Sequence, residues 1–97
     1  MYKFNKIDDK SVFTFEPKLD TAKCNGKENE ILSILGGCKK EVVFDMTGVD
    51  YISSYFLRIC TIVAKEVGST NLKVVNSLPN VKKVFKIAGF DQLMDIS

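Results

Sequence analysis

The chain of 97 residues contains no histidine. Without an imidazole the sequence cannot form the Ser-His-Asp or Cys-His arrangements that activate a nucleophile, and nearly every zinc site that uses histidine is excluded as well. The three cysteines, Cys24, Cys38 and Cys60, are an odd number and share no Cys-x-x-Cys spacing. This usage is typical of a reducing compartment rather than of a disulfide framework.

The chain also lacks long apolar segments and strong charge asymmetry. No apolar run approaches the roughly 20 residues that span a bilayer, and charged residues among the first ten interrupt any signal-peptide pattern. Gly36, Gly37 and Gly48 do not have the spacing of a phosphate-binding Walker loop. The net charge is only +2, with the lysines scattered along the chain. We therefore expect a cytoplasmic protein with no membrane span, no nucleic-acid partner and no cofactor.

Apolar periodicity predicts strands that alternate with helices after an opening hairpin. The predicted strands are Tyr2–Ile7, Val12–Glu16, Val42–Asp45 and Leu72–Asn76, with a turn at Asp8-Asp9-Lys10 and a short last strand in Leu93–Ile96. The predicted helices are Thr21–Leu35, weakened at Asn25-Gly26, then Ser53–Val67, and one that opens at Pro79 and is closed by Gly89. We expect an α/β fold in one domain, residues 1–97, with a central mixed sheet of four to five strands and three to four helices mainly on one face.

Two of the predicted helices have a clear apolar face. In the second helix this face consists of Phe56, Leu57, Cys60, Val63, Ala64 and Val67, and in the third it consists of Leu78, Val81, Val84, Phe85 and Ala88. Cys60 is therefore predicted to be a small core residue. A weak basic stretch in the third helix, formed by Lys82, Lys83 and Lys86, is interpreted as an ordinary solvated face.

The most informative segment is an apolar strand that leads into two serines at a helix start. It runs from Glu41 to Arg58 and contains Ser53 and Ser54. The free backbone N–H groups and the positive dipole end of a helix start favour negative charge. A serine there is a good site for a regulatory phosphate and a poor site for an unassisted nucleophile. The simpler alternative is a capping hydroxyl, which stabilises a helix by roughly 0.5–2 kcal/mol.

The residues of this segment resemble a known family. The stretch Val43–Arg58, Val-Phe-Asp-Met-Thr-Gly-Val-Asp-Tyr-Ile-Ser-Ser-Tyr-Phe-Leu-Arg, resembles the signature of STAS domains, the fold of bacterial anti-sigma-factor antagonists. Leu19-Asp20 resembles the family's Leu-Asp after its second strand, and Leu72–Asn76 followed by Pro79–Phe90 resembles its closing strand and helix. The resemblance spans nearly the whole chain in the family's order.

The resemblance implies a small protein-interaction switch rather than an enzyme. In such proteins a partner kinase, which is also an anti-sigma factor, phosphorylates a serine at the helix start, and a phosphatase restores it. The unmodified form captures the anti-sigma factor. By position Ser54 resembles this phosphoacceptor, and Ser53 stands where many members have aspartate. Tyr55 and Phe56 replace a small residue and a glycine, which predicts an altered docking surface.

The candidate partner-binding residues are Asp20, Asp45, Thr47, Ser53, Tyr55, Phe56 and Arg58. Asp20 and Asp45 are expected at the ends of neighbouring strands near the start of the second helix. There they could cap loops, assist phosphoryl transfer or help to hold a partner's Mg-nucleotide. Tyr55 is expected to be exposed beside Ser54, whereas Phe56 is expected to be partly buried.

Two other functions stay open on the sequence alone. A STAS domain without the phosphoswitch could be a scaffold, in a stressosome-like assembly or as the soluble subunit of a lipid transporter, and the Tyr55-Phe56 pair favours this alternative. A small enzyme or ligand-binding protein that uses a cysteine or the carboxylates is disfavoured because histidine is absent. The partners that the resemblance implies are an anti-sigma factor with serine kinase activity and a phosphatase, and the chain is expected to be a monomer or weak dimer.

Overall fold

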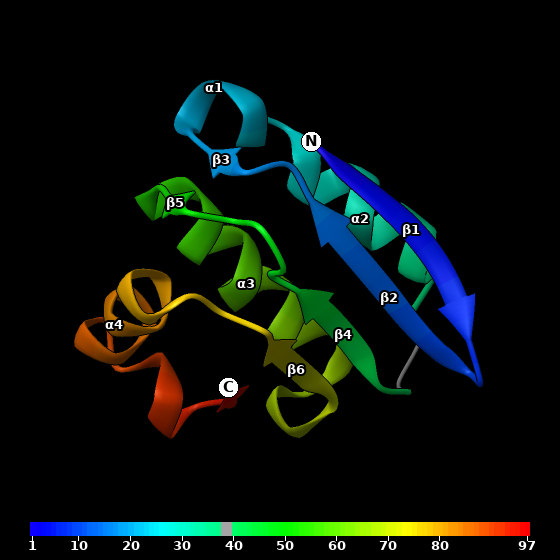
Figure 1. Cartoon of the computed structure of the whole chain (residues 1–97). Coiled ribbons are helices and arrows are strands. Elements are labelled where there is room, and N and C mark those ends of the chain that lie inside the picture. Colours follow the sequence, from blue (N-terminus) through cyan, green and yellow to red (C-terminus); the bar gives the residue numbers. More distant parts are fainter. Residues whose placement is uncertain (38–39) are drawn as a thin grey trace.

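The computed structural model describes residues 1–37 and 40–97 (Figure 1). The strands are β1 Tyr2–Ile7, β2 Lys10–Phe15, β3 Lys18–Leu19, β4 Val42–Asp45, β5 Tyr51–Ile52, β6 Leu72–Val75 and β7 Asp95–Ile96. The α-helices are α1 Thr21–Cys24, α2 Lys27–Leu35, α3 Ser54–Val67 and α4 Pro79–Ile87, and two short 3-10 helices, η1 Ser69–Asn71 and η2 Phe90–Gln92, follow α3 and α4. Cys38 lies outside the described residues.

The main sheet has the order β1-β2-β4-β6-β7. Strands β1 and β2 pair antiparallel, while β2, β4, β6 and β7 pair parallel to one another. Helices α2 and α3 cover one face of this sheet, and α4 lies beside β5 (Figure 1). The prediction of a mixed α/β fold with an opening hairpin and up to five strands is confirmed, including the short last strand.

The hairpin turn is shorter than predicted. Asp8 and Asp9 alone form it, both with positive φ (49° and 67°), and β2 begins at Lys10 rather than at Val12. Two consecutive left-handed residues make the turn whose twist matches that of the flanking strands, and aspartate tolerates this conformation. The assignment of Lys10 to the turn is therefore wrong.

The first predicted helix is divided in two. Helix α1 ends at Cys24 and α2 begins at Lys27, because Gly26 adopts a left-handed conformation with φ 78° that interrupts the helix. The irregularity predicted at Asn25-Gly26 is thus a complete break. The break turns α2 away from α1 and places the amide of Gly26 near the start of α3, where Tyr55 contacts it.

A cluster of aromatic rings joins the sheet to α3. Phe13 and Phe44 lie on adjacent strands in register, with ring centroids 5.6 Å apart. The Phe56 ring of α3 lies 5.2 Å from that of Phe15 and 6.0 Å from that of Phe44. Phe13, Phe44 and Phe56 are completely buried. This cluster fixes where α3 begins on the sheet.

The predicted core faces of the helices need two corrections. In α3, Ile59 is buried although it lies outside the predicted face, whereas Leu57 is only half-buried; Cys60 is buried as predicted. In α4 only Val81 and Phe85 are buried, whereas Leu78, Val84 and Ala88 of the predicted apolar face are exposed. Helix α4 packs against β5 and η2 rather than across the sheet, so the narrow apolar stripe of Val81 and Phe85 is enough to attach it.

A second, two-stranded sheet is an addition to the predicted fold. Strands β3 and β5 pair in parallel, with Lys18 opposite Tyr51 and Leu19 opposite Ile52. The amide of Ser53 then donates to the carbonyl of Leu19 at 2.9 Å. Two-residue strands have no detectable alternation, so the sequence could not reveal them. This small sheet positions the residues immediately before α3.

No helix in the described ranges is both long and apolar enough to cross a membrane.

Replacing Phe44 by alanine should lower the free energy of unfolding by about 3–5 kcal/mol, because the ring is fully buried between Phe13 and Phe56. Urea unfolding followed by circular dichroism measures this loss. The control is Phe4→Ala on the edge strand, where the ring is 37% exposed and less packing is lost. Equal losses in the two variants would show that the aromatic cluster does not dominate the core.

Candidate functional site

The two serines at the start of α3 have different environments. Ser53 is the N-cap: its backbone is extended (φ −91°, ψ 168°), its side-chain oxygen accepts the Phe56 amide at 3.3 Å, and it is 6% exposed. Ser54 is the first helical residue, is exposed, and has no hydrogen-bond partner for its hydroxyl within the part of the chain that the structure describes. Ser53 therefore serves the helix, whereas the Ser54 hydroxyl is available to an external molecule.

Phe56 and Ser53 do not belong to the accessible surface. Phe56 is completely buried in the aromatic cluster, more than the partial burial that its position predicted. A glycine is not required there because the bulky ring points into the core, away from any docking protein. Because both side chains are buried, Phe56 and the N-cap Ser53 contribute no exposed surface to docking in this structure, and their role in partner binding stays a prediction.

Tyr55 is half-buried rather than exposed as predicted. Its hydroxyl donates to the Glu28 carboxylate, whose oxygens lie 2.8 and 3.0 Å away, and accepts the Gly26 amide at 3.1 Å. The guanidinium carbon of Arg58 lies 5.8 Å from the centre of the Tyr55 ring. Tyr55 therefore attaches the junction between α1 and α2 to the start of α3. The sequence signal that could have found this contact is Glu28, a charged residue on the otherwise apolar face formed by Cys24, Ile31 and Leu35.

Asp45 caps the loop that follows β4. One of its oxygens accepts hydrogen bonds from the Thr47 amide at 3.0 Å, the Thr47 hydroxyl at 2.6 Å and the Asn76 side-chain amide at 3.1 Å. Asn76, with φ 59°, follows the neighbouring strand β6. Partial burial raises the pKa of Asp45, but these hydrogen bonds outweigh it and the net pKa is lowered. The contacts support the loop-capping interpretation.

Asp20 and Asp45 lie at the ends of strands from different sheets. Asp20 follows β3 and is the N-cap of α1, where its carboxylate accepts the Lys23 amide at 2.8 Å. Asp45 ends β4 of the main sheet. The prediction that they terminate neighbouring strands is therefore wrong, because the unpredicted β3–β5 pairing separates β3 from the main sheet. Each carboxylate is engaged in its own local cap.

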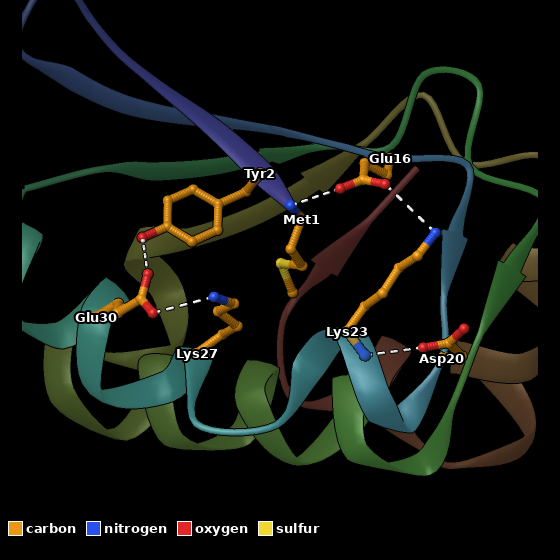
Figure 2. A network of polar contacts seen from close by, with 7 residues as sticks. All are labelled: Met1, Tyr2, Glu16, Asp20, Lys23, Lys27 and Glu30. Atoms are coloured by element: carbon orange, nitrogen blue, oxygen red, sulfur yellow. Dashed lines mark hydrogen bonds and ion pairs between the residues drawn. The ribbon is translucent and has the colours of Figure 1, made fainter.

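A polar network attaches the hairpin to α1 and α2 (Figure 2). Glu16 pairs with Lys23 at 3.3 Å and with the Met1 amine at 2.6 Å, while Glu30 pairs with Lys27 at 3.1 Å and accepts the Tyr2 hydroxyl at 3.1 Å. Hydrogen bonds from the Met1 amine and Lys23 lower the pKa of Glu16, and those from Lys27 and Tyr2 lower the pKa of Glu30. The charges of this network are paired with one another, so we assign it a structural role.

The described cysteines are unsuited to nucleophilic chemistry. Cys24 and Cys60 are completely buried, and burial raises the pKa of both thiols. A buried thiol with a raised pKa supplies no thiolate at neutral pH. The described residues also contain no group of three cysteine or acidic side chains that could hold a metal ion.

Comparison with known proteins assigns the family. Residues 2–97 match the model of the STAS domain, so the chain belongs to the STAS domain family, as the sequence resemblance predicted. It is 28% identical over 95 residues to BtrV of Bordetella bronchiseptica, which carries the name of an anti-sigma factor antagonist; the match covers 96% of this chain and 82% of BtrV.

Solved structures share the fold. The anti-sigma factor antagonist SpoIIAA in its unphosphorylated form matches with a TM-score of 0.84 and 14% identity, covering 100% of this chain and 88% of that one. The phosphorylated form of SpoIIAA, a Bacillus cell fate determinant, matches with a TM-score of 0.75 and 15% identity, covering 100% and 91%. An anti-sigma-factor antagonist domain protein from Planctomyces limnophilus matches with a TM-score of 0.87 and 14% identity, covering 98% and 87%. The architecture is therefore that of the anti-sigma factor antagonists.

Replacing Tyr55 by phenylalanine should lower the free energy of unfolding by about 1 kcal/mol, because the hydroxyl group bridges Glu28 and Gly26. The matched control is Tyr51→Phe. Tyr51 is 50% exposed and its hydroxyl has no partner in the described part of the chain, so its change should stay within about 0.5 kcal/mol. Urea unfolding measures both. If the two variants lose the same stability, the Tyr55 bridge contributes nothing.

The Asp45 cap should make stability depend on pH. Because folding lowers the Asp45 pKa, its contribution is present above the ordinary pKa of aspartate and is lost as the pH falls through the lowered value. Thr47→Val removes one donor, so the Asp45 pKa should rise, and the variant should lose about 1 kcal/mol at pH 7 and progressively less in acid. Carbon NMR titration of the carboxylate and urea unfolding test this. The control is Thr70→Val, which removes an exposed hydroxyl; an unchanged Asp45 pKa in Thr47→Val would contradict the prediction.

Proposed function

We propose that this chain is an anti-sigma factor antagonist, a switch that binds an anti-sigma factor in its unmodified form and is released by phosphorylation of Ser54. The observation that carries the proposal is the contrast between the two serines at the start of α3. Of these two, Ser54 alone combines exposure with a hydroxyl that no described group engages. The names of BtrV and SpoIIAA, and the existence of a phosphorylated form of SpoIIAA, support the same function.

The start of α3 can accept a phosphate without loss of the fold. A phosphate adds a charge of about −1.5 to −2 at pH 7. Ser54 is the first residue of α3, so the phosphate would lie near the free backbone N–H groups and the positive end of the helix dipole. The neighbouring residues that hold the helix in place, Ser53 and Phe56, point inward and need not move. The charge would therefore change the surface and leave the core as it is.

Binding would then be controlled by desolvation and repulsion. A partner that packs closely over the start of α3 has to remove water from whatever group Ser54 carries, and removing a dianion from water is far more costly than removing a hydroxyl. Of the candidate partner-binding residues, Thr47 and Arg58 are exposed and Asp20, Asp45 and Tyr55 are partly exposed. We propose that these five residues surround Ser54 in the docking surface or support it from beneath.

In this function the chain is a substrate and not an enzyme. The partner kinase transfers the γ-phosphoryl group of ATP to the Ser54 oxygen, the hydroxyl proton passes to a base of the kinase, and ADP leaves. A phosphatase adds water to the phosphoserine and releases inorganic phosphate, which restores the hydroxyl. We propose that this cycle takes place in the cytoplasm, because the kinase step consumes ATP.

The specific alternative is a scaffold that lacks the phosphoswitch. The half-buried Tyr55 beside Ser54 favours it, because a bulky ring held by Glu28 limits how closely a kinase can approach. The two functions differ in one respect that can be measured. A scaffold binds its partner whether or not residue 54 carries negative charge.

The test uses a candidate partner, a histidine-kinase-like anti-sigma factor sought among the neighbouring genes, which is purified and incubated with ATP and the chain. Mass spectrometry should find one phosphate, on Ser54, in wild type and in Ser53→Ala, and none in Ser54→Ala. Ser53→Ala is the control for the neighbouring hydroxyl and should cost only about 0.5–2 kcal/mol of stability through loss of the N-cap. Ser54→Asp should bind the anti-sigma factor at least about tenfold more weakly than the unphosphorylated wild-type chain does. Phosphate on another residue defeats the proposal, and full binding by Ser54→Asp favours the scaffold.

A further inference from the structure

Helix α4 carries positive charge that the chain itself does not neutralise. Lys82, Lys83 and Lys86 are exposed, and no carboxylate in the described ranges forms an ion pair with them. The helix contains no acidic residue of its own. Lys3, Lys6 and Lys65 likewise form no ion pair within the described chain, but α4 is the element that carries three such lysines. The other described lysines pair with a carboxylate, in the pairs Lys10–Glu41, Lys18–Asp50, Lys23–Glu16, Lys27–Glu30, Lys40–Asp9 and Lys73–Asp95.

The same helix exposes apolar side chains. Ile87 is 76% exposed, and Leu78 and Val84 are 40% and 38% exposed. Together with Leu93 after η2, they form half of the large hydrophobic residues that the described chain exposes. These side chains remain exposed because Val81 and Phe85 alone attach the helix to the core. Apolar surface concentrated on one element marks an interaction surface more often than scattered exposure does.

The cationic and apolar side chains are interleaved. Lys83 is one helical turn from both Lys86 and Ile87, and Ile87 is one turn from Val84, so these four side chains are neighbours on the outward side of α4. A helix that inserts into a membrane surface separates an apolar face from a basic face. In α4 the uniformly apolar stripe, Val81 and Phe85, is already turned into the core. A mixed surface with an apolar centre and charged surroundings fits a protein partner instead.

The α4 surface is continuous with the start of α3. The Asn80 side-chain amide donates to the Asp50 carbonyl at 2.8 Å, which fixes the first turn of α4 to the entry of β5. Tyr51, 50% exposed, follows directly in β5, and β5 leads into the Ser53 cap and Ser54. Figure 1 shows α4 and β5 side by side near the start of α3. A protein docked over Ser54 could therefore reach α4 without a gap.

We propose that the outward face of α4, formed by Lys83, Lys86, Val84 and Ile87, docks an acidic and partly apolar segment of the same anti-sigma factor that covers Ser54. The inference rests on the proposed function and adds the chemistry of the partner. Charge complementarity selects carboxylates for the lysines, and Ile87 supplies the apolar anchor. Carboxylates of the partner that lie beside α3 would also repel a phosphate on Ser54, and this repulsion strengthens the switch.

The test measures the affinity of the purified anti-sigma factor for unphosphorylated variants of the full chain. Lys83→Glu/Lys86→Glu should raise the Kd at least about tenfold and weaken the dependence of binding on salt. The control, Lys3→Glu/Lys6→Glu, makes the same change in net charge on the exposed edge strand β1. This strand lies at the opposite side of the main sheet from β6 and β7, between which α4 stands in the chain, so the Kd should stay nearly unchanged. Ile87→Ser should raise the Kd about tenfold, whereas Ile7→Ser on β1, where Ile7 is 52% exposed, should not.

The outcomes separate this inference from the proposed function. If wild type binds the anti-sigma factor but the α4 variants bind equally well, the α4 surface is not part of the interface and only this inference is overturned. If wild type itself does not bind, the proposed function fails and the inference fails with it. If the α4 variants keep their affinity for the protein but lose binding to phosphatidylserine vesicles that wild type shows, the surface serves a membrane and the inference is wrong.

Discussion

The position of Ser54 depends on the burial of Phe56. The Phe56 ring packs against Phe15 and Phe44 of the sheet, and its amide donates to the Ser53 side chain. One residue therefore fixes the helix start on the core and completes the cap that defines the first turn. The neighbouring hydroxyl of Ser54 is left exposed as a consequence, because the helix turns it away from the side that carries Phe56.

Three further contacts hold the surroundings of Ser54 in place. Strands β3 and β5 pair just before α3, the Tyr55 hydroxyl bridges to Glu28, and Asp45 caps the loop after β4. The first two contacts join segments that are distant in the sequence, and Asp45 also accepts a hydrogen bond from the distant Asn76. A surface held in this way can change its charge without changing its shape, so an electrostatic switch suits this fold better than a conformational one.

The sequence predicted the elements that have strong periodicity and missed contacts that depend on tertiary structure. The apolar runs of β4 and β6 predicted the sheet, and the predicted helix Ser53–Val67 differs from α3 only in its first residue, which is Ser54. The exposure predicted for Tyr55 is wrong because its environment depends on Glu28, which no local pattern connects to it. The apolar stripe did predict burial of Phe56, but its complete burial depends on the rings of the sheet. The same reason explains α4. Its lysines resemble any solvated face in the sequence, and only the structure reveals that they lack carboxylate partners in the described chain and that Lys83 lies one turn from an exposed Ile87.

Amide hydrogen exchange of the chain with and without phosphate on Ser54 tests the electrostatic switch most directly. If the phosphate acts through surface charge, the protection of core amides such as those of Phe44, Phe56 and Val63 should be the same in both forms, while binding to the anti-sigma factor is lost. Changes should be confined to the first turn of α3 and to β5. Loss of protection along the whole of α3, or across the sheet, would show that the phosphate acts by rearranging the fold and would contradict a switch that works through surface charge alone.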